Sequence, residues 1–366
     1  MKCTAKRESL IGPIAQVERS VGKNLTVPVL ACVLMRVEGN TLTLTATNLE
    51  VGVRYSVPVS GGVDGTVAVP AGVFSHVLSS LPSGAEVALE VVEQVLVVQG
   101  GGGSSRITVQ DAEEFPSLPV VDEGVDVTLP QKALVSALSS VAYCASTSTV
   151  KPELASVFVH PAGNELVCAA TDSFRLAEKK VPLKQSVEAD PFLIPARSVH
   201  DMVRVLTDDD KPVTLRVGEH QLSLTIGGVY MTLRLTQGTF PDYTQIIPKE
   251  FVAEATLLVA DFERVLKKAS VFSDKFQQIL LTVEPEEGVF TVHTENSAVG
   301  ESTDTVPAAL EGESLAVRFN QRYLNDAFHT IHTDSFVFKW SGGSTPAVMR
   351  PVGDDSVVYL VMPMNR

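Results

Sequence analysis

The chain has 366 residues, with 29 basic and 43 acidic side chains and a formal net charge of −14. At roughly 100–200 residues per domain, this length predicts two or three domains with sizeable cores. The negative charge argues against a protein that binds nucleic acid by overall attraction, because such domains are usually basic. No run approaches about 18 consecutive apolar residues, which argues against a membrane span.

The N-terminus and the cysteines predict a cytoplasmic protein. Residues 1–8 lack the apolar segment that a secretory signal requires. The four cysteines (Cys3, Cys32, Cys144 and Cys168) are far apart and show no CxxC spacing. Buried free thiols in a reducing compartment are therefore expected.

In chain order, amphipathic helical windows are separated by strands of period two. Apolar residues three and four positions apart predict helices at 6–20, 70–80, 131–142, 196–206, 261–275 and 320–330. Alternating apolar and polar residues predict strands, most clearly at 41–46, 222–226 and 231–235. Alternation of this kind is typical of antiparallel sheets that cover a core with one face, so the predicted class is α+β.

Three patterns recur with a period near one third of the chain. They are Ala46-Thr47-Asn48, Ala170-Thr171-Asp172 and His293-Thr294-Glu295 in strands; Val69-Pro70-Ala71, Ile194-Pro195-Ala196 and Phe319-Asn320-Gln321 at helix starts; and Phe115-Pro116, Phe240-Pro241 and Met362-Pro363. The period is too long for a solenoid unit and fits a whole domain. We therefore predict three copies of one domain, each with antiparallel strands and two helices, at 1–120, 125–246 and 250–366.

The charge is distributed unevenly between helices and strands. The six helical windows carry four more basic than acidic side chains, so the remainder of the chain carries eighteen more acidic than basic ones. If the helices share one surface, that surface attracts phosphates locally while the remainder repels nucleic acid. The alternative is that these charges are the ordinary content of solvent-exposed helix faces.

No catalytic constellation stands out. The Gly100–Gly103 run is not part of a GxxxxGK[ST] phosphate loop, and no GxSxG motif occurs. His329 and His332 lie three apart, but no carboxylate or cysteine lies at ligand spacing around them. Asp208-Asp209-Asp210 precedes Lys211-Pro212 and is better explained as a solvated turn. We expect no catalytic residue, cofactor or metal site.

The ordered motifs resemble those of the bacterial replicative sliding clamp family, the beta subunit of DNA polymerase III, over the full length. They are Leu25-Thr26-Val27-Pro28-Val29-Leu30, Thr43 to Glu50, Ala170 to Ala177, Phe240-Pro241-Asp242-Tyr243, Phe319-Asn320 with Tyr323, and Tyr359-Leu360-Val361-Met362-Pro363-Met364. The resemblance implies a DNA-clamp fold whose sheets lie outside and whose helices lie inside a ring-shaped homodimer. It also implies a non-catalytic processivity factor for DNA replication and strand elongation, at replication forks in the nucleoid.

The resemblance implies two kinds of partner. Duplex DNA would pass through the ring without sequence-specific contacts, because weak phosphate contacts permit sliding. The polymerase catalytic subunit, the clamp loader and repair proteins would bind through linear peptides. Carried over by motif, the peptide pocket comprises Leu154, Thr171, Phe174, Arg175, Leu176, Pro241 and Ile246 in one part, and Asn320, Tyr323, Pro346, Leu360, Met362, Pro363 and Met364 in the other. For Leu176, Ile246 and Leu360, the alternative is plain core packing.

The chain departs from the family pattern at several positions. Phe174 replaces a more usual His or Arg, Ser173 a common Gly, and Gly72 an expected DNA-contacting Arg. The expected DNA contacts are Lys23, Asn24, Ser148, Arg197, Arg204, Lys267 and Lys268. The expected dimer contact is Val271-Phe272 against Ile107.

Two other interpretations remain open at this point. One is a repeat-built scaffold that binds no DNA, for which helix and strand charges need not differ. The other is an enzyme with an active site between domains, which requires a deep polar pocket with convergent titratable groups.

Overall fold

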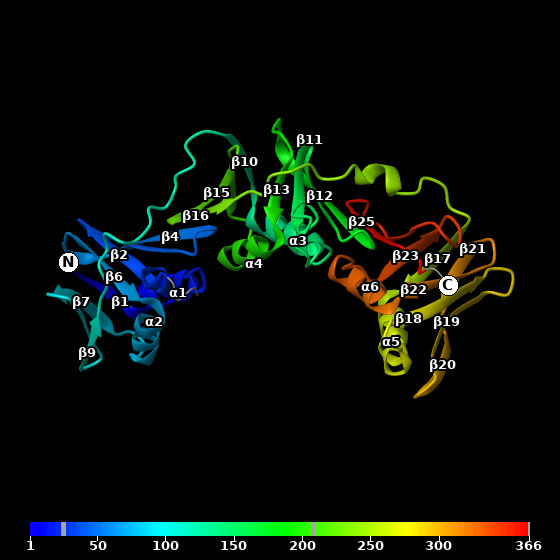
Figure 1. The fold of residues 1–366 in the computed structure, drawn as a ribbon, viewed down its shortest axis with the longest axis horizontal. Coiled ribbons are helices and arrows are strands. Elements are labelled where there is room, and N and C mark those ends of the chain that lie inside the picture. Colours follow the sequence, from blue (N-terminus) through cyan, green and yellow to red (C-terminus); the bar gives the residue numbers. More distant parts are fainter. Residues whose placement is uncertain (23–26, 207–208, 365–366) are drawn as a thin grey trace. The chain divides into compact units, whose positions relative to one another are not determined.

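The computed structural model describes residues 1–22, 27–206 and 209–364, and these form two compact units. Unit 1 comprises Met1–Lys132 and His200–Leu235, and unit 2 comprises Ala133–Val199 and Thr236–Arg366. Figure 1 labels the helices and strands along the chain. Within the described residues, no helix is long and apolar enough to cross a membrane.

Unit 1 contains a five-stranded and an eight-stranded antiparallel sheet, in the orders β5-β1-β7-β8-β9 and β10-β14-β15-β16-β4-β3-β2-β6. The first-sheet strands are β1 (Lys2–Lys6), β5 (Ser60–Val63), β7 (Glu86–Val92), β8 (Val95–Gly100) and β9 (Gly103–Thr108). The second-sheet strands are β2 (Cys32–Glu38), β3 (Thr41–Thr47), β4 (Val51–Pro58), β6 (Gly65–Pro70), β10 (Val125–Pro130), β14 (Pro212–Val217), β15 (Gln221–Ile226) and β16 (Val229–Arg234).

Unit 2 also contains two antiparallel sheets, in the orders β13-β11-β12-β25-β24-β23-β17-β21 and β20-β19-β18-β22. The eight-stranded sheet comprises β11 (Ser156–Thr171), β12 (Arg175–Val187), β13 (Phe192–Pro195), β17 (Ala253–Leu258), β21 (Ala308–Gly312), β23 (Ser335–Trp340), β24 (Ala347–Pro351) and β25 (Val357–Val361). The four-stranded sheet comprises β18 (Gln278–Glu284), β19 (Val289–Asn296), β20 (Gly300–Thr305) and β22 (Leu315–Asn320).

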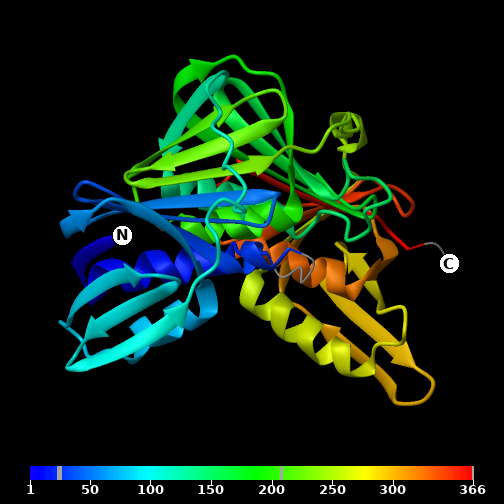
Figure 2. The ribbon, with the colours of Figure 1, turned by 60° about the vertical axis from the view of Figure 1, so that its left-hand side comes forward.

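Every predicted helical window contains a helix. The helices are α1 (Arg7–Arg19), α2 (Ala71–Ser80), α3 (Gln131–Ala142), α4 (Ala196–Val205), α5 (Val259–Ala269) and α6 (Gln321–Asp326), with 3₁₀ turns η1 (Pro28–Ala31), η2 (Tyr243–Ile246), η3 (Ser270–Phe272) and η4 (Ala327–His329). Helix α1 buries Leu10, Ile14 and Val17, which lie on one helical face. In Figure 2, α1 and α2 lie side by side, and α5 packs against the sheet that contains β19 and β20.

The first two repeat anchors form the same turn. The Thr47 hydroxyl donates to the Val51 carbonyl at 3.0 Å, and the Thr171 hydroxyl donates to the Arg175 carbonyl at 2.7 Å. The residue two positions after each threonine has a positive φ, 74° at Leu49 and 75° at Ser173. The sequence repeat is therefore a structural repeat.

The third anchor is shifted by one residue from its predicted position. Buried strand pairs Met35–Leu44 and Leu281–Val292 occupy equivalent places in their sheets. Leu44 therefore corresponds to Val292. Two residues further along each strand, on the same face, Ala46 corresponds to Thr294. The matching segment is Thr294-Glu295-Asn296, and not His293-Thr294-Glu295 as predicted.

Neighbouring repeats share their sheets. Strand β4 pairs with β16, with Val51 opposite Leu233, and β12 pairs with β25, with Arg175 opposite Val361. Each eight-stranded sheet therefore contains strands from two repeats, which is why the compact units cut across the predicted central domain. The boundaries 1–120, 125–246 and 250–366 stay predictions.

Candidate functional site

A largely apolar pocket of about 800 Å³ lies in unit 2 near the β12–β25 junction. Its lining combines apolar side chains with a polar rim: Lys151, Glu153, Leu154, Thr171, Ser173, Thr239, Pro241, Asp242, Tyr243, Gln245, Ile246, Pro248, Ser341, Thr345, Pro346 and Met362. The segment 239–248 follows the strands of the second repeat, and 341–346 connects β23 to β24. A site of this size and composition can hold several side chains of a linear peptide.

The pocket is built on a tightly packed apolar cluster. That cluster contains Leu154, Ala169, Leu176, Leu193, Phe240, Tyr243 and Leu360, with Phe158, Ile247 and Met362 packed against it. The rings of Phe158 and Phe240 stack with centroids 4.9 Å apart. The Tyr243 hydroxyl donates a hydrogen bond to buried Glu178, and burial raises the pKa of Tyr243. The floor of the pocket is therefore formed by tightly packed core residues.

The predicted peptide-binding residues divide into three groups. Six of them line the pocket: Leu154, Thr171, Pro241, Ile246, Pro346 and Met362. Leu176 and Leu360 are fully buried in the cluster beneath it, so the core-packing alternative describes their structural role. Ile246 is half-exposed at the rim, so that alternative is wrong for it. Phe174, Arg175, Asn320, Tyr323, Pro363 and Met364 are not part of the lining.

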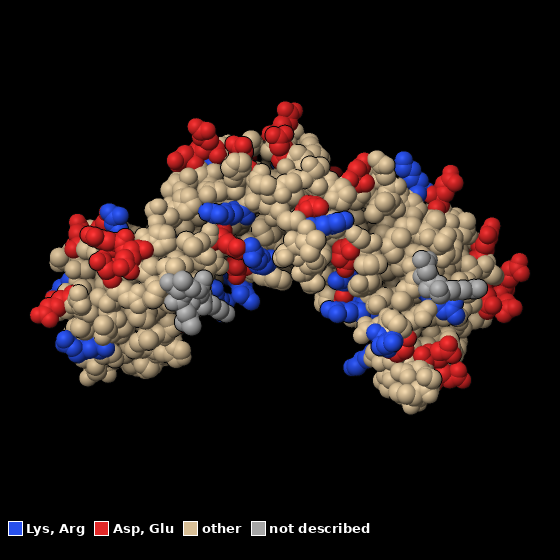
Figure 3. All heavy atoms as spheres, viewed as in Figure 1, with Lys and Arg blue, Asp and Glu red and all other residues tan. Residues whose placement is uncertain are grey.

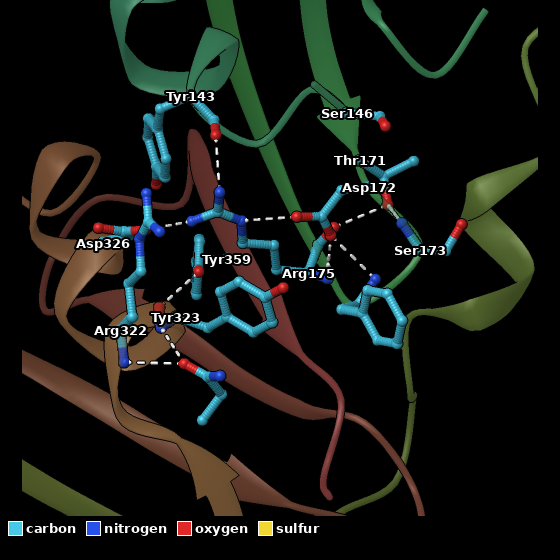
Figure 4. Close-up of polar contacts among 12 residues, drawn as sticks. Tyr143, Ser146, Thr171, Asp172, Ser173, Arg175, Arg322, Tyr323, Asp326 and Tyr359 are labelled. Atoms are coloured by element: carbon cyan, nitrogen blue, oxygen red, sulfur yellow. Dashed lines mark hydrogen bonds and ion pairs between the residues drawn. The ribbon is translucent and has the colours of Figure 1, made fainter. Parts of the chain in front are cut away.

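Arg175 is a buried ion-pair hub beside the pocket (Figure 4). Its guanidinium donates to Asp172 at 3.0 Å, to Asp326 and to the Tyr143 carbonyl at 2.9 Å. It also lies over the Tyr323 ring, 4.7 Å from the centroid. Arg175 therefore connects the turn after β11 to the end of α3 and to α6.

The turn that carries Phe174 is held by the same carboxylate. Asp172 Oδ1 accepts hydrogen bonds from the backbone N–H groups of Phe174 and Arg175, at 2.9 and 3.0 Å. Ser173 has a positive φ of 75°, a conformation that glycine adopts at least cost. Phe174 is left 59% exposed and stacks on Tyr323, with centroids 6.4 Å apart. This aromatic pair lies outside the cavity.

The C-terminal segment is hydrogen-bonded on both sides. The Met362 N–H donates to the Phe174 carbonyl at 2.8 Å, and the Met364 N–H donates to the Arg318 carbonyl at 2.8 Å. Asn320 caps α6 by accepting from the Arg322 and Tyr323 N–H groups. These contacts place Asn320 and Met364 next to the cavity, whose lining includes Pro346 and Met362 of the same predicted part.

Sequence reasoning missed much of the polar rim. Asp242 and Tyr243 belong to the motif Phe240–Tyr243, so the motif signalled them. Lys151 and Glu153 follow Ser148, which was predicted to contact DNA and not a peptide. Ser341 and Thr345 lie in a polar turn between two strands. Such turns have similar sequences whether or not they line a pocket, so the sequence did not identify these two residues.

A second hollow, of about 890 Å³, lies between α5 and α6 and is rich in hydrogen-bond donors. Ala260, Glu263, Arg264, Lys267, Ser270, Gln277, Gln321, Arg322 and Asn325 line it. Figure 3 shows Lys and Arg gathered over this end of unit 2, with Asp and Glu along its strand-covered margin. Such a donor-rich groove suits phosphate oxygens.

The predicted DNA contacts fall in different settings. Lys267 is exposed in the α5–α6 hollow, whereas Lys268 donates to Asp304 on β20 at 2.9 Å. Ser148, Arg197 and Arg204 are exposed, and Arg204 lies 3.8 Å from an Asp201 oxygen. Lys23 and Asn24 lie outside the described residues. Arg264 and Arg322 were missed, although both are in predicted helical windows.

The predicted dimer residues also differ in exposure. Val271 is 65% exposed, and Phe272 is half-buried beside Gly300 at the start of β20. Ile107 is only 4% exposed, because it belongs to the buried face of β9. Its side chain is largely buried in its own protomer, and its part in the dimer contact stays a prediction.

The cysteines are not poised for nucleophilic chemistry. All four are buried, and burial raises the pKa of Cys3 and Cys32 to about 11 and that of Cys168 to about 12. Burial also raises the pKa of Cys144. Thiols with such values are almost entirely protonated, and therefore weakly nucleophilic, at neutral pH.

Replacing Arg175 with Met should lower the free energy of unfolding by about 3 kcal/mol, because Asp172 and Asp326 lose a buried counter-charge. The matched control is Arg216→Met, which breaks an exposed bidentate pair with Asp126 and should lower the free energy of unfolding far less, because solvent screens that pair. Urea denaturation measures both. Equal losses in the two variants would contradict the structural role of Arg175.

Family models for the DNA polymerase III beta subunit match nearly the whole chain. The N-terminal domain model matches residues 1–119, the central domain model 128–242 and the C-terminal domain model 244–365. The chain is 29% identical over 372 residues to the beta sliding clamp of Synechococcus elongatus, and 25% identical over 375 residues to that of Staphylococcus aureus strain Mu50. Each alignment covers 100% of this chain and 99% of the relative.

Solved structures agree with these matches. The DnaN sliding clamp of Pseudomonas aeruginosa, bound to griselimycin, superposes with a TM-score of 0.96 at 26% identity over 100% of both chains. The DNA polymerase III beta subunit of Thermotoga maritima gives a TM-score of 0.93 at 25% identity, covering 100% of this chain and 99% of that one. The chain therefore belongs to the DNA polymerase III beta subunit family, the sliding clamps that act as non-catalytic processivity factors in bacterial DNA replication.

Proposed function

We propose that two copies of this chain close head to tail into a ring around duplex DNA in the cytoplasm, at replication forks. The polymerase, the clamp loader and repair proteins each bind to the 800 Å³ pocket through a linear peptide segment of their own. The observation that supports the ring concerns two sets of equivalent strands. Two strands of each set pair with each other within the chain, and the third strand of each set is left at a sheet edge. This observation distinguishes this function from a scaffold protein that binds no DNA.

Each repeat offers one strand of each set. One set is β4, β12 and β20, and the other is β9, β16 and β25. Within the chain β4 pairs with β16 and β12 with β25, while β20 and β9 are at the ends of their sheets. An unpaired edge strand is a template for another chain. Pairing β20 of one protomer with β9 of the other repeats the junction already used twice.

The existing junctions also give the register of this pairing. Gly52 on β4 lies opposite Thr232 on β16. By the strand alignment of the repeats, Gly52 corresponds to Glu301 on β20, and Thr232 corresponds to Arg106 on β9. Arg106 of one protomer therefore faces Glu301 of the partner subunit. Directly opposed charges of opposite sign stabilise strand pairs.

Charge reversal tests this register. Arg106→Glu should weaken the dimer at least tenfold, because two like charges then lie opposite each other. Arg106→Glu combined with Glu301→Arg should restore the dimer dissociation constant to within about threefold of the original value. Sedimentation equilibrium measures the constants, with Arg36→Glu on the interior strand β2 as control. No rescue by the double variant would refute the register.

The ring contacts DNA through its helices. The α5–α6 hollow offers Arg264, Lys267 and Arg322 together with several amide groups, and Lys267 has no ion-pair partner among the described residues. Scattered phosphate contacts of this kind carry no sequence information and permit sliding. Arg197 and Arg204 on α4 are the next candidates. Lys268 is a weaker one, because Asp304 already occupies its ammonium group.

The topological function predicts a dependence on DNA ends. The protein loaded by its clamp loader onto a nicked circular duplex should be retained, and it should be lost within minutes once the circle is linearised. The Arg106→Glu variant, with open ring interfaces, should be lost from both forms. Retention is measured by gel filtration of the DNA. Equal retention of the unmodified protein on circular and linear DNA would exclude encirclement.

The pocket is expected to accept leucine- or phenylalanine-bearing peptides. Its apolar lining includes Leu154, Ile246 and Met362, and methionine adapts to differently shaped side chains. Ile246 is well suited to a test because it lines the cavity and is 47% exposed, so its replacement leaves the core intact.

Ile246→Asp should weaken peptide binding at least tenfold, because it places a charge in an apolar contact surface. Fluorescence anisotropy with a labelled linear peptide that carries a leucine–phenylalanine pair measures the affinity. The control is Val92→Asp on β7, where the valine is 46% exposed and far from the pocket in sequence. Unchanged affinity in the Ile246 variant would remove this pocket as the peptide site.

A further inference from the structure

The edge strand β20 and its neighbour β19, in the four-stranded sheet of unit 2, carry three metal-ligating side chains on one face. His293 and Glu295 are two residues apart on β19, so they project from the same side. Glu301 on β20 lies directly opposite Glu295, and Thr303 lies opposite His293. One ligand atom from each of His293, Glu295 and Glu301 lies within 4.8 Å of the others.

The two glutamates form an unfavourable cross-strand pair in the isolated protomer. Like charges directly opposite each other destabilise a strand pair. Neither Glu295 nor Glu301 has a Lys or Arg within ion-pair distance among the described residues. An adjoining hollow of about 590 Å³ adds Asp274 and contains no basic side chain. The local charge therefore favours a bound cation.

The histidine is oriented for ligation. Its Nδ1 lies 2.9 Å from the Thr303 hydroxyl, which can accept the Nδ1 proton. The Nε2 lone pair is then available to an ion, in the arrangement that fixes many metal-binding imidazoles. Ligands about 2.1 Å from a shared zinc ion lie roughly 3.4 Å apart, so small rotations of the exposed glutamate side chains bring the three donors to bonding distance.

We propose that His293, Glu295 and Glu301 bind a divalent transition-metal ion of the zinc class at the open edge of β20. One imidazole nitrogen and two carboxylates suit zinc, with water completing a tetrahedral site. Cations that prefer oxygen ligands, such as Mg²⁺, are less suited to this site, because imidazole is a poor ligand for them.

The ion and the partner subunit compete for one carboxylate. This consequence rests on the proposed dimer, in which Arg106 of the partner subunit faces Glu301. In the closed ring the guanidinium neutralises Glu301, and in the open protomer the metal ion does so. Zinc binding therefore stabilises the open edge and opposes ring closure, by mass action on the state that binds it.

Metal binding is tested by titrating the full chain with Zn²⁺ in a calorimeter and with Co²⁺ by visible absorption, at concentrations that populate protomers. We expect one ion per chain. His293→Ala and Glu295→Gln should each weaken binding at least tenfold. The control is His220→Ala, which removes an exposed histidine whose Nε2 lies 3.6 Å from Glu219 and which has no third ligand in the part of the chain that the structure describes. Unsaturable binding, or equal affinity in all variants, would overturn the site.

The competition is tested separately by sedimentation equilibrium. Zn²⁺ at a saturating concentration should raise the dimer dissociation constant at least fivefold in the unmodified chain and leave that of His293→Ala unchanged. Zinc binding without a change in dimerisation would overturn the competition. Absence of a dimer in metal-free buffer would instead contradict the proposed ring and leave the calorimetric test of the site intact.

Discussion

Antiparallel backbone pairing between neighbouring repeats is the interaction on which the molecule depends. At β4–β16 and β12–β25, the hydrogen bonds of one repeat continue into the next, and no flexible tether is needed between them. The same pairing explains the two ends of the series, because β9 and β20 retain unpaired edges. Assembly and domain arrangement thus follow from one type of contact, used twice within the chain and proposed a third time between chains.

The β12–β25 junction also creates the pocket. Strand pairing brings the turn after β11 next to the C-terminal segment, and Arg175 fixes that turn to α6 and to the end of α3. The apolar cluster beneath supplies a floor that does not need to reorganise when a peptide binds. The equivalent hollow at the β4–β16 junction is smaller, about 270 Å³, because Gly52 leaves room that Leu118 fills. One repeat unit therefore produces a peptide-sized pocket at one junction and a shallow hollow at the other.

The sequence predictions were least accurate where they depended on which face of a sheet, or which surface, a residue occupies. The predicted anchor at His293 lies one residue early, because the register is fixed by the buried pairs Met35–Leu44 and Leu281–Val292 and not by the sequence offset. Leu176 and Ile246 looked alike in sequence, yet one is core and the other is pocket rim. Ile107 follows the alternation of strand β9, so its inward orientation is predictable from period two.

The sequence by itself determined the helices, the strand-rich composition and the threefold repeat, because amphipathic periodicity and turn chemistry are local properties that neighbouring residues encode. It also determined the family through motifs spread over the chain. Only the tertiary structure decided which of those residues meet. Arg175 and Asp326 are 151 residues apart, and the exposed or buried state of each leucine depends on which strand lies against it. Long-range pairing has no local signature, so the pocket, the ion-pair hub and the open edges became visible only in the folded chain.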